Sequence, residues 1–127
     1  MPDEFVPLDT AKYTRFHRQL SAKGIVINSN LRYVDRHRKE LLQHYKNFAD
    51  YRECFTIPQQ VIDGIFADGE KQNIRPKDDD ERQQTLPYLR LQLKALVARD
   101  LWGIDQYFVI INEQNDILLR ALQLLQQ

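Results

Sequence analysis

Residues that reverse the chain are scarce in this sequence. Its 127 residues include only four glycines and five prolines. A many-stranded sheet needs a turn about every eight to twelve residues, so this scarcity excludes a large β-sandwich or β-barrel. There is also a single cysteine, Cys54, which has no partner for an internal disulfide and therefore does not indicate a redox compartment.

An excess of one charge is also missing. Lysine plus arginine number 18, and aspartate plus glutamate number 18, so the formal net charge is zero. This balance argues against a nucleic-acid binder or a polybasic membrane-surface module, both of which depend on excess positive charge. No apolar run approaches the roughly 18 residues that span a bilayer. The first residues lack the basic and then apolar segments of an export signal.

Apolar residues are present in sufficient number for a core, at 43% of the sequence. They recur with the helical period of 3.6 residues and nowhere sustain the alternation of a strand. The sequence therefore predicts an all-α, compact multi-helix domain with a short extended N-terminal lead-in. We assign residues 1–9 to the lead-in, because Pro7 disfavours helix, and residues 10–127 to the helical domain.

Three helices are expected in the first half of the chain. Asp9 or Thr10 can cap the first, which Gly24 would end. The second spans about 25–45, and Asn47 can cap a short third helix. The apolar face of the second helix, which Arg38 interrupts, would hold Leu31, Val34, Leu41, Leu42 and Tyr45.

Two longer helices are expected next. Thr56–Gln59 has the form of a capping box that opens a helix ending between Gly69 and Asn73. Asp78 with Glu81 can cap the longest helix, which would end at Trp102 and Gly103. Its apolar stripe from Leu86 to Leu101 is interpreted as core, with Trp102 as an anchor of that core. Pro87 predicts a kink or a fresh start near Thr85.

The last part of the chain predicts two further segments. Tyr107–Ile111 reads as a turn-rich apolar block, and Asn115 can cap a final helix. The apolar residues of that helix would be Ile117, Leu118, Ala121, Leu122 and Leu125.

Candidate catalytic and metal-binding residues are few. Ser21 and Ser29 lie outside any Gly-x-Ser-x-Gly elbow, so we interpret them as solvated capping or surface residues. Cys54 is interpreted as a half-buried structural thiol. His37 and His44 share a helix face but stand two turns apart, too far to bind one metal, and are interpreted as surface residues. We therefore predict no catalytic residue, no metal site and no cofactor.

Two charged runs also have plain interpretations. The acidic run 78–81 lacks the alternating ligands and glycine of a calcium loop, so helix capping explains it better. The basic run 36–39 is flanked by Asp35 and Glu40 and has no interleaved aromatic residues, so a solvated helix face explains it better than a phosphate-binding site.

Three stretches carry a resemblance to a known family. They are Pro2–Thr10, Tyr33–Leu41 and Leu91–Gly103, the last followed closely by Asn112–Asp116. In order and spacing they resemble the region after the catalytic core in bacterial carboxy-terminal processing proteases, also called tail-specific proteases. The resemblance runs over essentially the whole chain, and Leu91–Gly103 is its most specific part. None of the stretches is a catalytic motif.

The resemblance implies a parent enzyme with a peptide-binding PDZ domain and a serine nucleophile activated by a lysine. Both catalytic residues would lie upstream of Met1, so this segment is expected to be no enzyme itself. The resemblance further implies a periplasmic or cell-envelope location, contacts with the upstream protease and PDZ domains, and protein substrates of the parent. A homo-oligomer is possible, and no nucleic-acid partner is expected.

Two functional classes follow. The first is a non-catalytic C-terminal domain of a processing protease, which serves scaffolding, assembly or substrate access. The alternative is a free-standing helical adaptor that binds another protein through an apolar groove. They differ in the extended lead-in, which only a domain continuing from a protease core requires.

Overall fold

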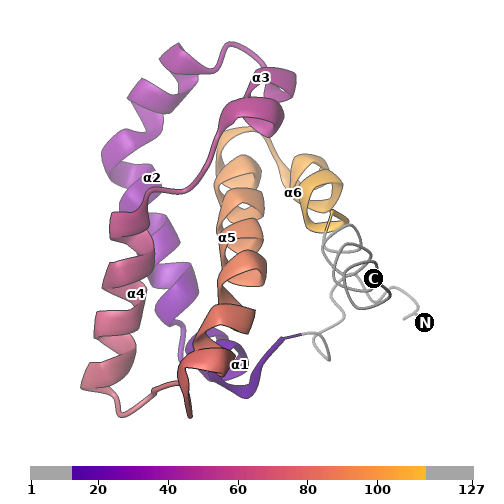
Figure 1. The fold of residues 1–127 in the computed structure, drawn as a ribbon. Helices are drawn as coiled ribbons and strands as arrows, with labels where there is room; N and C mark the ends of the chain where they lie inside the picture. The colour runs from indigo at the N-terminus through magenta and orange to yellow at the C-terminus, as the bar shows by residue number, and fades with distance from the viewer. Residues whose placement is uncertain (1–12, 114–127) are drawn as a thin grey trace, which may run out of the picture.

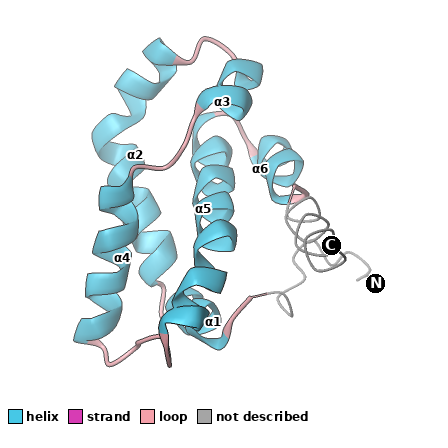
Figure 2. Cartoon of the chain, in the orientation of Figure 1, coloured by secondary structure: helices cyan, strands magenta, loops and turns pink. Residues whose placement is uncertain are grey.

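The computed structural model describes residues 13–113, and 78% of these are helical. The six helices of this region run in sequence from α1 at the N-terminal side to α6 at the C-terminal side (Figure 1). Their bounds are α1 Arg15–Ala22, α2 Ile25–His44, α3 Phe48–Cys54, α4 Gln59–Lys71, α5 Asp79–Leu101 and α6 Ile104–Ile111. The all-α fold class is thus confirmed, and no strand occurs within the described range (Figure 2).

The longest helix, α5, is the centre of the arrangement. It contacts α1, α2 and α6, while α2 also contacts α1 and α4. In Figure 1, α2 and α4 lie side by side, α6 lies on the other side of α5, and α3 lies near the end of α5 that leads into α6. Side chains from the other five helices pack with those of α5 and form one core.

The predicted stripe on α5 is core, as expected. Leu89, Leu93, Leu96 and Val97 are buried, whereas Leu86 and Leu101 at its ends are partly buried. The helix continues through Pro87 without a fresh start, so that part of the prediction was wrong. Pro87 has no amide to donate to the Gln83 carbonyl. In the preceding turn, the Thr85 hydroxyl donates to the Glu81 carbonyl at 2.8 Å.

Other predictions for helix ends have mixed outcomes. Thr14 caps α1 by accepting from the His17 amide, so the predicted cap at Asp9 or Thr10 was wrong. Gly24 follows α1 with a φ of 75°, in the left-handed region that favours glycine. Asn47 caps α3, and Asp78 caps α5 by accepting from the Glu81 amide.

The prediction of a capping box that begins at Thr56 was wrong, because α4 begins only at Gln59. Pro58 stands at its N-cap position, with no side-chain cap. The apolar block Tyr107–Ile111 is helical and belongs to α6. On α2, Val34 and Leu41 are buried as predicted, but Leu31 and Leu42 are exposed, because the buried face turns toward Val26 and Asn30.

Several predictions fall outside the described residues. They are the extended lead-in 1–9, both bounds of the 10–127 domain, and the final helix capped by Asn115. Within the described range, no helix is both long enough and apolar enough to cross a membrane.

Candidate interaction surface

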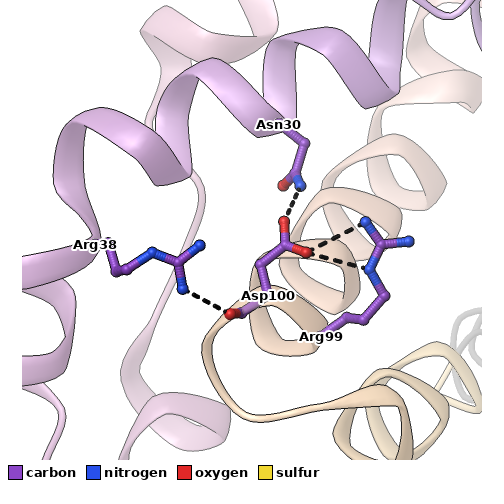
Figure 3. A network of polar contacts seen from close by, with 4 residues as sticks. All are labelled: Asn30, Arg38, Arg99 and Asp100. Atoms are coloured by element: carbon purple, nitrogen blue, oxygen red, sulfur yellow. Dashed lines mark hydrogen bonds and ion pairs between the residues drawn. The ribbon is translucent and has the colours of Figure 1, made fainter.

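A polar cluster joins α2 to the last turn of α5 (Figure 3). Its centre is Asp100, whose carboxylate accepts from Asn30 Nδ2 at 2.9 Å and lies 3.3 Å from the guanidinium of Arg99. Arg38 Nη1 donates to the backbone carbonyl of Asp100 at 2.8 Å. A residue that interrupts the apolar pattern of α2 thus satisfies a carbonyl at the end of α5.

Asn30 is the most buried member of this cluster. Its exposed fraction is 1%, and its Oδ1 has no hydrogen-bond partner, while the Asp100 side chain keeps 16% of its exposure. Removing a carboxylate from water costs free energy unless hydrogen-bond donors face it. Asn30 and Arg99 are the donors that offset this cost for the largely buried carboxylate of Asp100. The cluster thus fixes how α2 crosses α5.

Trp102 lies directly after the polar cluster. Its ring is edge-on to Tyr51 at 5.2 Å and to Phe48 at 5.8 Å between centroids. The Tyr51 hydroxyl in turn donates to the Lys94 carbonyl at 2.6 Å. Trp102 packs against the core, as predicted, but it is only partly buried, so it is a smaller anchor than a fully enclosed ring.

His17 on α1 is fully buried, which the sequence analysis did not anticipate. Its Nε2 lies 2.7 Å from Gln92 Oε1 on α5, and its ring stacks on Tyr13 at 4.0 Å. Burial lowers the pKa of His17, against a smaller opposing effect of the Gln92 hydrogen bond. Burial also raises the pKa of Tyr13 to about 12. Both groups are therefore neutral near pH 7 and serve packing.

The two surface histidines and the cysteine border one open hollow of about 660 Å³. It lies between the end of α2 and the α3–α4 linker, Phe55–Pro58. His37 Nδ1 lies 2.9 Å from Glu40 Oε1, and His44 is exposed, as predicted. Cys54 is exposed and not half-buried, because it is the last residue of α3 and points away from the core. Among residues 13–113, no cluster of three or more histidine, cysteine or acidic residues could hold a metal.

The serines are less exposed than the sequence suggested. Ser29 lies inside α2 and is buried, and the Ser21 hydroxyl is buried without a partner, so the interpretation of both as solvated residues was wrong. The charged runs agree better with expectation. Asp78 caps α5 with the other acids in its first turn, and Arg36 and Lys39 are exposed on α2.

The α3–α4 linker also borders a second, smaller hollow. This hollow has a volume of about 230 Å³ and is closed on its other side by α5. Its walls are mostly apolar, with two basic residues of α5 at the rim. We call it the linker groove; it is lined by Phe55, Thr56, Ile57, Pro87, Arg90, Leu91 and Lys94. Sequence reasoning missed it, because it is formed by segments about thirty residues apart.

Comparison with known proteins gives one match. The model of a family described as a family of unknown function, DUF8443, matches residues 16–103. The matched range begins in α1, ends directly after α5, and contains the Asn30, Arg38, Arg99 and Asp100 cluster. No curated protein and no solved structure matches this chain.

Proposed function

This chain belongs to DUF8443, a family of unknown function, and we propose that it serves as the non-catalytic C-terminal helical domain of a bacterial carboxy-terminal processing serine protease. The proposal rests on the sequence resemblance described above. In the parent enzyme the domain would be a rigid neighbour of the protease core that affects assembly or substrate access.

One observation supports a role in shape over a role in chemistry. Tyr33–Leu41 and Leu91–Gly103, which carry the resemblance, lie on α2 and α5 and meet where Arg38 bonds to the Asp100 carbonyl. The residues of the resemblance therefore include those that hold the two helices together.

An exposed apolar pair on α2 offers a contact with the protease core. Leu31 and Leu42 are 45% and 42% exposed, and their spacing of about three helical turns puts them on one face. Domains of one chain meet through surfaces that mix apolar and polar groups, and Asp35 and Lys39 lie on the same helix. We propose that this face of α2 contacts the core.

The test is to express the parent enzyme with and without everything after Thr10. We expect the folded truncated enzyme to retain covalent labelling of its serine, and to change in oligomer size or in turnover of a folded substrate. Leu31→Asp with Leu42→Asp should reproduce that change in the full enzyme, whereas Arg36→Asp, at an exposed position on a different side of α2, should not. Loss of serine labelling in a demonstrably folded truncation would mean that the segment completes the active site, which contradicts the proposal.

A further inference from the structure

The linker Phe55–Pro58 is an extended segment with unused backbone groups. Phe55 has φ −74° and ψ 133°, and Pro58 has φ −61° and ψ 143°, both extended. The Phe55 amide donates to the Tyr51 carbonyl and the Pro58 carbonyl accepts from Val61. Between them, the amides of Thr56 and Ile57 have no partner among the described residues. Extended backbone with free amides can pair with another extended chain.

The side chains of this linker alternate between the core and the outside. Phe55 and Ile57 are buried, whereas Thr56 and Pro58 are exposed. The linker groove lies beside this segment, with Pro87 and Leu91 of α5 on its far side. Its volume of about 230 Å³ and mostly apolar walls suit one aliphatic side chain of a bound peptide.

The rim of the linker groove carries two basic side chains, and no carboxylate lines the groove. Arg90 donates to the Gln59 side-chain amide, and Lys94 Nζ donates to the Arg52 carbonyl at 2.6 Å. Neither makes an ion pair within the described part of the chain. The carboxylate of Glu113, which lies close enough to influence Lys94, is bound to Arg52 at 2.8 Å. Two cations one helical turn apart thus face an apolar hollow, an arrangement complementary to an acidic ligand.

We propose that the linker groove binds an extended acidic segment of a partner protein. The segment pairs its backbone with one of the two free amides, because successive amides of an extended chain point to opposite edges, and it inserts one aliphatic side chain into the hollow. A carboxylate two residues away, on the same side of the segment, reaches Lys94 or Arg90. In an extended chain such side chains lie about 7 Å apart, close to the spacing of about 6 Å between neighbouring turns of α5. The proposal does not depend on the function proposed above.

The test uses the full 127-residue chain and a blocked peptide, acetyl-Gly-Glu-Ser-Leu-Ser-Glu-Gly-amide, titrated near pH 7. Isotope-edited NMR should show the amide of Thr56 or of Ile57 among the resonances that shift most. Replacing both peptide glutamates by lysine, or its leucine by serine, should each weaken binding roughly tenfold or more. These comparisons change only the peptide and not the protein, so they remain informative if a protein variant fails to fold.

Protein variants complete the test. Lys94→Glu and Arg90→Glu should each weaken binding roughly tenfold, whereas Lys39→Glu, which makes the same charge change on exposed α2, should not. The proposal is overturned if the peptide does not bind below about 1 mM, if the lysine peptide binds equally well, or if Lys39→Glu weakens binding as much as Lys94→Glu. It is also overturned if a second peptide, which has no glutamate but has a free C-terminal carboxylate, binds as tightly as the blocked peptide with two glutamates.

Discussion

Arg38 on α2 donates a hydrogen bond of 2.8 Å to the backbone carbonyl of Asp100 at the end of α5. The two residues are 62 positions apart in the sequence. A helix leaves its last four carbonyls without helical partners, and Arg38 satisfies one of them while the Asp100 side chain binds Asn30 (Figure 3). One residue of α5 is therefore held by two residues of α2, through both its backbone and its carboxylate.

Asn30→Ala should lower the free energy of unfolding by about 1–3 kcal/mol. The substitution removes the buried donor of the Asp100 carboxylate and leaves that group with only Arg99 beside it. Chemical denaturation measures the change. Asn28→Ala, at an exposed position of the same helix, is the matched control and should stay within about 0.5 kcal/mol. Equal effects of the two substitutions would show that the Asn30 contact is not stabilising.

Two glycines of α4 should respond in opposite directions to alanine. A Cβ on Gly69 would lie 2.9 Å from Leu20 Cδ2 and 3.1 Å from the Ile74 carbonyl, so Gly69→Ala should cost about 1–3 kcal/mol. A Cβ on Gly64 would meet nothing within 4 Å, so Gly64→Ala should stabilise by about 0.4–1 kcal/mol. Thermal unfolding of both variants tests the close packing of α1 on α4. A stable Gly69→Ala variant would contradict that packing.

Trp102→Ala should destabilise the fold by about 2–3 kcal/mol. Replacing a fully buried aromatic residue costs about 3–5 kcal/mol, and Trp102 is only partly buried against Phe48 and Tyr51. Circular dichroism during denaturation measures this change without requiring the indole signal. Trp102→Phe should recover about half of the loss, because it keeps the edge-on contact. A denaturation midpoint unchanged in Trp102→Ala would indicate that the ring makes no stabilising contact.

Stability should fall in mild acid because of His17. Burial lowers its pKa in the folded chain below the usual 6.5, so the unfolded chain binds a proton more readily as the pH falls. The free energy of unfolding should therefore decrease as the pH drops below about 6.5. His17→Gln should reduce this loss between pH 7 and 5, whereas His44→Gln, at an exposed position, should keep it. The same slope in His17→Gln and the parent would assign the acid sensitivity to other groups.

The helices were predictable because their signals are local. The capping residues Asn47 and Asp78 and the left-handed Gly24 act within one turn of the chain, and the structure has all three in those roles. The predicted starts of α1 and α4 were wrong by a few residues: α1 begins after Thr14, and α4 begins after Pro58, which makes no side-chain cap. Several nearby residues can serve as a helix start, so a sequence pattern locates a helix better than it locates the first residue of that helix.

The polar contacts were not predictable, because each depends on a helix crossing. Arg38 read as an interruption of an apolar face until α5 was found opposite it. His17 stands four residues after Tyr13 and three before Leu20, so it shares the buried face of α1 with them and with Phe16. This spacing could have predicted its burial from the sequence. The linker groove likewise appears only when Phe55–Pro58 lies against α5.

The most direct measurement of the central claim is the mass of the native polypeptide that contains these residues. An antibody against residues 13–113 would isolate it from cells of its source organism, and mass spectrometry would give its intact mass and peptide map. Our account predicts a polypeptide much larger than 15.2 kDa, whose upstream peptides include a serine that a covalent probe labels. A native polypeptide of 15.2 kDa without such peptides would contradict the account and favour the free-standing adaptor.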